Sequence, residues 1–133
     1  MKTLLMGLGR QGSRILELAL QKGIEPVEVV DASPEAGGKA AAAHGKRIRV
    51  LEKNPLALSE AERIGFLKGY GLVLDALPSF HSYRLIRSGI RAGVKMVSVS
   101  FLAEDFMSLD GEARECGALI IPDCGGAPGF SHM

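Results

Sequence analysis

The decisive stretch of this chain reads Gly7-Leu8-Gly9-Arg10-Gln11-Gly12. A short apolar run precedes it and apolar residues at helical spacing follow it, so it predicts a tight turn between a buried strand and a helix. The first glycine, Gly7, allows the turn, and the third, Gly12, lets the helix pack close to the strand. The second, Gly9, lets the backbone approach a pyrophosphate. The helix that is expected to begin at about Gln11, directly after Arg10, offers free N–H groups and a positive dipole end to phosphate groups.

An acid follows the second apolar run of the chain. Val27–Val30 ends on Asp31-Ala32-Ser33, and Asp31 lies 19 residues after Gly12. That separation matches the spacing of about 20 residues at which an acid binds the ribose of a dinucleotide. A carboxylate at this position favours NAD because it repels the 2′-phosphate of NADP. Arg10 and Ser33 leave NADP open, since a nearby arginine can accept that phosphate. The competing interpretation of Asp31 is a solvated loop acid.

The composition is that of one ordinary globular domain. The 133 residues are 47% hydrophobic and carry a formal net charge of +1, so a single core is expected and nothing favours nucleic acid or an anionic membrane as a partner. We expect neither a membrane-spanning segment nor a signal peptide. The two cysteines, Cys116 and Cys124, have neither disulfide nor metal spacing, which favours a cytoplasmic location. Lys46-Arg47-Ile48-Arg49 alternates like a strand with one solvated face.

Strand-like and helix-like segments alternate along the whole chain. The strands are expected at about Lys2–Met6, Val27–Asp31, Arg47–Leu51, Leu72–Ala76, Lys95–Val99 and Ala118–Pro122. The helices are expected at about Gln11–Lys22, Pro34–His44, Leu58–Lys68, Ser79–Ala92 and Leu109–Cys116. The strands are short continuous apolar runs, which is typical of a parallel sheet buried on both faces. The pattern predicts an α/β fold, a doubly wound Rossmann-type parallel sheet of about six strands with helices on both faces.

Further candidate residues follow the later strands, because ligands of such sheets lie beyond the carboxyl ends of the strands. The small residues of Ala76-Leu77-Pro78 would let a ribose and a nicotinamide approach the backbone, and the hydroxyls of Ser98 and Ser100 would line the reacting side of the pocket. Ser79 is at least as well explained as a helix cap. His81 and Cys124 have the chemistry for catalysis, but neither has a recognisable partner, so no catalytic residue is assigned.

The chain resembles the N-terminal half of the saccharopine dehydrogenase-like oxidoreductases, which include saccharopine reductases, lysine 6-dehydrogenases and carboxynorspermidine dehydrogenases. The likeness rests on Leu5–Gly12, on Leu72–Pro78 with Ile90–Val94 and Val97–Ser100, and on Leu109–Gly117 with Ile121–Gly125 and Pro128–Ser131. The resemblance implies an NAD(P)-binding domain of an oxidoreductase that acts on a C–N bond of a small, amino-acid-like substrate. It also implies a partner domain for substrate binding and dimerisation, which allows a homo-oligomer.

The chain departs from the family pattern in three places. His132 stands where the family usually has asparagine, and Leu51-Glu52-Lys53-Asn54-Pro55 replaces an acid-rich turn near the adenine. Family members also continue beyond this length, so residues 1–122 are expected to form the dinucleotide-binding domain and residues 123–133 to begin the crossover to a substrate domain. The alternative is a freestanding dinucleotide sensor, like the regulatory domains of potassium transport systems. The segment Pro128–Ser131 favours the enzyme, since a sensor does not need it.

Overall fold

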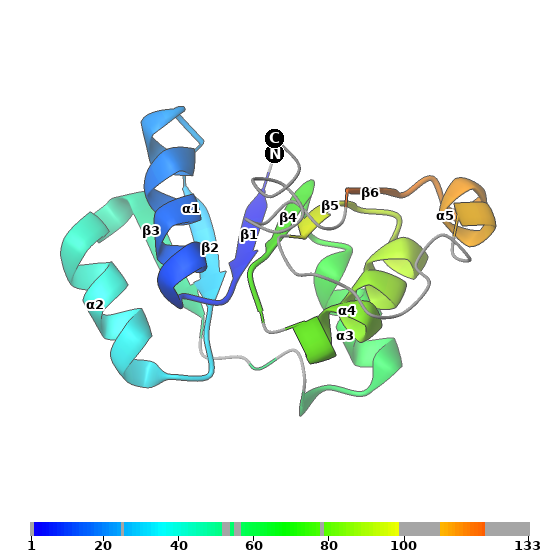
Figure 1. Ribbon diagram of the computed structural model, residues 1–133, viewed down its shortest axis with the longest axis horizontal. Coiled ribbons are helices and arrows are strands. Elements are labelled where there is room, and N and C mark those ends of the chain that lie inside the picture. Colours follow the sequence, from blue (N-terminus) through cyan, green and yellow to red (C-terminus); the bar gives the residue numbers. More distant parts are fainter. Residues whose placement is uncertain are drawn as a thin grey trace.

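The fold is a parallel, doubly wound sheet. The computed structural model describes residues 2–24, 26–51, 54, 57–77, 79–98 and 110–121. Within them, six parallel strands lie in the order β3-β2-β1-β4-β5-β6 (Figure 1). The strands are β1 (Thr3–Met6), β2 (Val27–Val30), β3 (Ile48–Leu51), β4 (Leu72–Asp75), β5 (Lys95–Ser98) and β6 (Leu119–Ile121). The strand order reverses between β1 and β4. Folds of this kind bind their ligands at such a point, beyond the carboxyl ends of the two strands.

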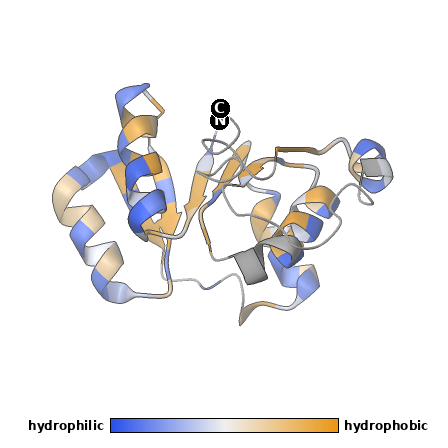
Figure 2. Ribbon diagram, in the orientation of Figure 1, coloured by the Kyte–Doolittle hydropathy of each residue, from blue (hydrophilic) through white to orange (hydrophobic). Residues whose placement is uncertain are grey.

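Helices cover both faces of the sheet, as the sequence predicts. They are α1 (Arg10–Gln21), α2 (Pro34–His44), the short 3₁₀ helix η1 (Gly45–Arg47), α3 (Glu60–Leu67), α4 (Ser79–Ala92) and α5 (Asp110–Cys116). Helices α1 and α2 pack on the β1–β3 half through one hydrophobic cluster, whereas α3, α4 and α5 pack on the opposite face through another. Figure 2 shows apolar strands between helices whose polar residues lie on their outer sides.

The ends of the helices follow the predicted signals. The Ser33 hydroxyl accepts a hydrogen bond from the Ala36 N–H at 3.3 Å, and Pro34 occupies the first turn of α2. Ser59 and Glu62 form the reciprocal capping box of α3. The three glycines expected to end helices, Gly23, Gly93 and Gly117, all have positive φ.

One local prediction is wrong. Lys46 and Arg47 do not begin the third strand, because both lie in η1. The Arg47 guanidinium donates a hydrogen bond to the carbonyl of Leu20 at 2.7 Å. This bond ties the turn before β3 to the end of α1 and draws the residue away from the extended backbone that the charge alternation suggested. The strand therefore begins at Ile48.

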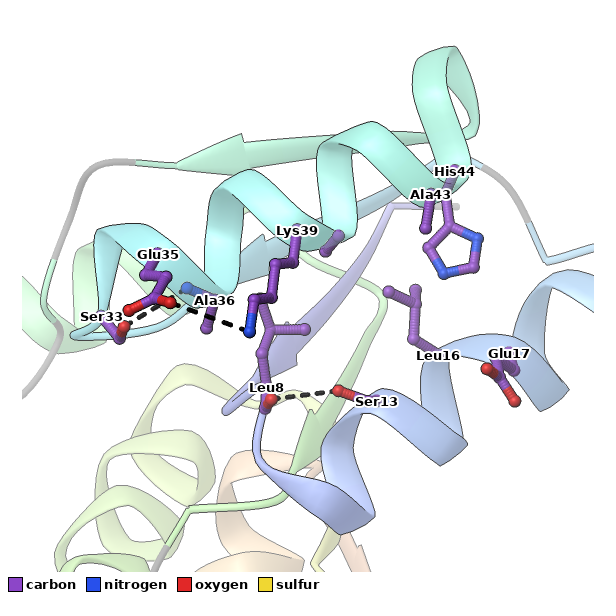
Figure 3. A pocket seen from close by; sticks show the side chains of 11 residues that line it. Leu8, Ser13, Leu16, Glu17, Ser33, Glu35, Ala36, Lys39, Ala43 and His44 are labelled. Carbon is purple, nitrogen blue, oxygen red and sulfur yellow. Dashed lines mark hydrogen bonds and ion pairs between the residues drawn. The ribbon is translucent and has the colours of Figure 1, made fainter.

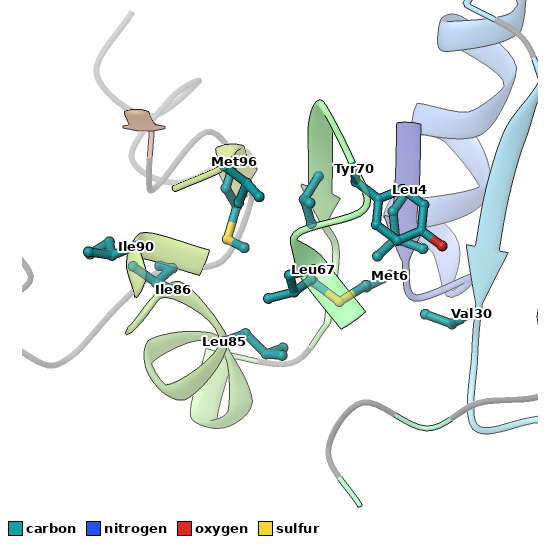
Figure 4. Close-up of a cluster of buried hydrophobic side chains, with 11 residues drawn as sticks. Leu4, Met6, Val30, Leu67, Tyr70, Leu85, Ile86, Ile90 and Met96 are labelled. Atoms are coloured by element: carbon teal, nitrogen blue, oxygen red, sulfur yellow. The ribbon is translucent and has the colours of Figure 1, made fainter. Parts of the chain in front are cut away.

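The sheet is buried on both faces only in part. Leu4, Leu5 and Met6 of β1 have no exposed surface, and alternate residues enter the two clusters, one of which is drawn in Figure 4. In β6, by contrast, Leu119 and Ile121 are 54% and 46% exposed. The expectation of strands buried on both faces thus holds at the centre of the sheet and is wrong at this edge strand.

A polar contact joins β2 to the segment that precedes β4. Tyr70, which precedes β4, donates its O–H to the carboxylate of Glu28 on β2. Glu28 also lies 3.8 Å from the guanidinium of Arg49 on β3. The Tyr70 ring meets Phe66 edge to face, with 5.5 Å between the ring centroids. Burial, and then the bond to Glu28, raise the pKa of Tyr70 above its ordinary value.

Candidate functional site

Two glycines of the turn are required by the protein's own packing. Gly7 follows β1 with φ of 98°, and a Cβ built there would lie 2.8 Å from the carbonyl oxygen of Ala76. A Cβ on Gly12 would lie 1.9 Å from the carbonyl oxygen of Gly7. No real Cβ fits at such distances, and the obstructing atoms are backbone that cannot rotate away. The turn is therefore wedged between the end of β4 and the first turn of α1.

The middle glycine differs from both. Gly9 precedes α1 with φ of −69°, and no atom of the described residues lies within 4 Å of a Cβ built on it. No side chain of the described residues caps this helix start. The N–H groups of its first turn, contributed by Arg10, Gln11 and Gly12, are therefore the donors that a helix start leaves unpaired. Open space, a glycine and unpaired donors coincide at this point, which is an arrangement suited to an anion.

Asp31 is bound to the turn that it faces. Its Oδ2 accepts a hydrogen bond from the Leu8 N–H at 2.6 Å, and its Oδ1 accepts one from the Ser33 N–H at 2.7 Å. The acid thus joins the glycine turn to the start of α2. A carboxylate offers about four acceptor sites, so two remain for the hydroxyls of a ligand. Ala32 and Ser33 line the same pocket as Asp31.

A buried acid shapes the other side of the turn. Asp75, at the end of β4, is 1% exposed and accepts hydrogen bonds from the Ser98 hydroxyl at 2.9 Å and the Leu77 N–H at 3.0 Å. The Ala76 N–H donates to Met6 at 2.8 Å, which fixes the strand end against β1. Sequence reasoning gave Asp75 no role. An acid at the end of a buried apolar run was the available signal, because such a group needs partners.

The structure brings together only part of the predicted set. Ala76 and Leu77 lie beside Gly7, on the neighbouring strand end. Pro78 and Ser100 lie outside the described residues, as do Cys124, His132 and the predicted crossover at residues 123–133. Cys116 is a free, exposed thiol.

Two pockets adjoin the turn. One, of about 580 Å³, lies beyond the carboxyl ends of β2 and β3. It is lined by Asp31, Ala32, Ser33, Pro34, Gly37, Gly38, Ala41, Val50, Leu51 and Asn54. The other, of about 460 Å³, lies between α1 and α2, with Leu8 and Ser13 at the end near the turn and His44 at the far end (Figure 3). A 3.8 Å ion pair between Lys39 and Glu35 stands at its side.

The small residues of α2 form a wall of the first pocket. A Cβ on Gly37 would lie 2.9 Å from Cγ1 of Val50, so this glycine brings α2 close to β3. Sequence reasoning did not include Val50, Leu51 or Asn54 in the site. In the part of the chain that the structure describes, no group of three or more His, Cys, Asp or Glu side chains is placed to hold a metal. None of the described helices is long and apolar enough to cross a membrane.

Comparison with known proteins shows which proteins this chain resembles. The family model described as saccharopine dehydrogenase NADP binding domain matches residues 3–121. The apo saccharopine dehydrogenase (L-Glu forming) of Saccharomyces cerevisiae superposes with a TM-score of 0.79 at 18% identity, over 98% of this chain and 28% of that one. The chain therefore spans little more than a quarter of that enzyme.

Two further solved structures share the fold. The TrkA-N domain of the inner membrane protein ybaL from Escherichia coli has a TM-score of 0.66 at 19% identity, over 98% of this chain and 91% of that one. Biliverdin reductase from Synechocystis sp. PCC 6803, in complex with biliverdin and NADP⁺, has a TM-score of 0.70 at 19% identity, over 91% and 37%. At these identities the likeness establishes the fold alone.

Proposed function

This chain belongs to the family of saccharopine dehydrogenase NADP-binding domains, and we propose that it is the cofactor-binding part of an oxidoreductase acting on a C–N bond of an amino-acid-like substrate. The family is one of NAD(P)-binding domains of dehydrogenase-like oxidoreductases. The choice of a C–N bond is supported by the saccharopine dehydrogenase of Saccharomyces cerevisiae, of which this chain spans 28%. In such enzymes the cofactor carries the hydride, and the protein orients it and excludes water.

The contrast between Gly9 and its neighbours carries the proposal. Packing against backbone atoms explains why Gly7 and Gly12 are glycines, but no described protein atom explains Gly9. A pyrophosphate seated on the first turn of α1 supplies the missing reason, because a side chain at Gly9 would occupy its place. The unpaired N–H groups of Arg10, Gln11 and Gly12 would then donate to the phosphate oxygens.

The rest of the predicted set extends this site in two directions. We assign the pocket beyond β2 and β3 to the adenosine, with the free acceptor sites of Asp31 on the ribose and with Ala32 and Ser33 beside it. On the other side, Ala76 and Leu77, continued by Pro78 and Ser100, would border the nicotinamide half. The carboxylate of Asp31 favours NAD, because two unit charges about 4 Å apart repel by about 1 kcal/mol in water and more in a drier site.

Titration calorimetry with NAD tests the site through Gly9→Val. A Cβ at this position meets no described protein atom within 4 Å, so the variant should fold as the parent does and lose cofactor binding. Gly65→Val is the matched control, because a Cβ on Gly65 of α3 also meets nothing within 4 Å among the described residues and lies away from the turn. Undiminished affinity in Gly9→Val would show that the turn does not hold the cofactor.

The same titration with NADP tests the role of Asp31. The parent should bind NAD more tightly than NADP. In Asp31→Ser the ratio of the two dissociation constants should fall to about fivefold or less, the equivalent of about 1 kcal/mol. Tighter binding of NADP by the parent would contradict this assignment.

Turnover tests the division into domains. If residues 1–122 form only the cofactor domain and 123–133 begin a crossover, the 133-residue chain should bind NAD without oxidising lysine or saccharopine. Appearance of the absorbance of reduced nicotinamide would show that the chain holds a complete active site. The alternative of a dinucleotide sensor predicts the same result, and the gene sequence beyond Met133 distinguishes the two, since only the enzyme requires a following substrate domain.

A further inference from the structure

A third pocket, on the other face of the sheet from α1 and α2, carries an unusual set of charges. It has a volume of about 370 Å³, lies between α3 and α4, and is lined by Glu60, Arg63, Arg84 and Arg87. Three arginines therefore share one small pocket with one acid. The spacing of Arg84 and Arg87 along α4 would suit an ordinary solvated helix face, but the structure brings them together with a residue of another helix.

Arg63 is the fixed part of this pocket. Its side chain belongs to a residue only 4% exposed, and its guanidinium donates to the Ser88 hydroxyl at 3.1 Å and to the Leu58 carbonyl at 3.0 Å. Burial lowers the pKa of Arg63, the charge of Arg84 lowers it further, and Glu60 opposes the effect. The guanidinium is thus a positioned cation in the wall of the pocket, held beside a like charge.

Two of the three arginines of the pocket have no acid partner among the described residues. Glu60 is bound by Arg91, which also donates to Glu112 at 2.9 Å. Neither Arg84 nor Arg87 forms an ion pair with any carboxylate among the described residues, and both are exposed at the mouth. A turn further along the same helix, Arg91 thus has two acids while Arg84 and Arg87 have none.

We propose that this pocket binds a phosphate group, free or carried by a small molecule, at a site separate from the dinucleotide site. Guanidinium groups present planar pairs of N–H donors that match the oxygens of a phosphate, and the Ser88 hydroxyl and the Leu58 carbonyl already hold the Arg63 guanidinium in place. A dianion between Arg84 and Arg87 would remove the repulsion that these residues and Arg63 exert on one another. The volume of about 370 Å³ favours a small molecule over an extended chain.

Phosphate binding is best measured in the Gly9→Val background, because the first turn of α1 also suits phosphate. NMR spectra of this variant, titrated with inorganic phosphate and with glycerol phosphate at constant ionic strength, should shift the amide signals of α3 and α4. Comparison of the two ligands separates a free from an esterified phosphate. Acetate at equal ionic strength should bind more weakly, and a stronger response to acetate would overturn the assignment to phosphate.

Matched variants locate the site. The double variant Arg84→Ala with Arg87→Ala should weaken phosphate binding about tenfold or more, as expected for the loss of charge-assisted hydrogen bonds. Lys22→Ala with Lys68→Ala removes the same charge at exposed positions outside the pocket and should change binding by less than about twofold. Equal weakening in the two double variants, or no binding by the parent, would overturn the proposal.

A further double variant, which retains both positive charges, tests whether the alanine variant loses binding only because it misfolds. Arg84→Lys with Arg87→Lys retains both charges and removes the forked donors, so circular dichroism should be unchanged while phosphate binds several-fold more weakly. Unchanged binding in this lysine variant would show that a diffuse positive field, and not a built pocket, attracts the anion.

Discussion

The centre of the sheet and its β6 edge are closed to different degrees. At the centre, β1 has fully buried residues between two hydrophobic clusters, and backbone atoms lie close to Gly7 and Gly12 at distances that exclude a side chain. At the edge, β6 exposes about half of Leu119 and Ile121. The comparison teaches that the glycine turn and the N-terminus of α1 lie where the packing is tight, which holds the backbone of the turn in one shape.

The largest expected effect lies at the most tightly closed point. Gly12→Ala should lower the free energy of unfolding by about 3 kcal/mol or more, because the new Cβ would overlap the Gly7 carbonyl and neither backbone segment can move without disturbing β1. Gly38→Ala is the control, since a Cβ there meets no described atom within 4 Å. That change should stabilise α2 by about 0.5–1 kcal/mol. Urea denaturation of both variants measures the difference, and equal stabilities would contradict the packing argument.

A smaller effect is expected at the two acids that flank the turn. Asp75→Ala removes the buried carboxylate that accepts from the Ser98 hydroxyl and the Leu77 N–H and should cost about 2 kcal/mol in urea denaturation. Asp31→Ala also removes an acceptor of two hydrogen bonds, but Asp31 is only half-buried and water can replace it. It should cost about 1 kcal/mol or less. A larger loss in Asp31→Ala would show that the burial of the acid does not set the cost of removing it.

These two acids also show what could be predicted from the sequence. Apolar runs, glycines and caps are local signals, so the strands, the helices and the glycine turn are predicted to within two residues at their ends. The link between Asp31 and Leu8 and that between Asp75 and Ser98 each span 23 positions and depend on strand register, which no local pattern encodes. The wall formed by Gly37 and Val50 was missed for the same reason.

The contact between Tyr70 and Glu28 predicts a pH dependence. The raised pKa of Tyr70 means that the folded chain keeps the phenolic proton longer than the unfolded chain does. Its contribution to stability is therefore complete below about pH 10, the ordinary pKa of tyrosine, and is lost as the pH rises further. Denaturation at about pH 8 and about pH 10.5 should show a steeper loss for the parent than for Tyr70→Phe. Parallel losses would show that Glu28 and Tyr70 do not interact in the folded chain.

The smallest effect is expected at the open edge. Leu119→Thr should change the free energy of unfolding by no more than about 0.5 kcal/mol, because the leucine is 54% exposed. Val29→Thr on β2 places a hydroxyl where the side chain has no exposed surface and should cost about 1–3 kcal/mol. Thermal denaturation of the pair compares an interior strand with the edge strand directly. A large loss at Leu119 would mean that this face of β6 is closed in solution.

The hydrogen bond from Leu8 to Asp31 has a consequence for redesign of the domain and for its evolution. A protein engineer who removes the acid in order to admit NADP also releases the amide that fixes the glycine turn, so the variant should lose affinity for both cofactors while its preference shifts. The same link between cofactor preference and the shape of the turn applies when a protein of this kind changes its cofactor during evolution. The exchange therefore requires a second substitution that restores an acceptor for the Leu8 N–H, and the two changes are expected to be epistatic.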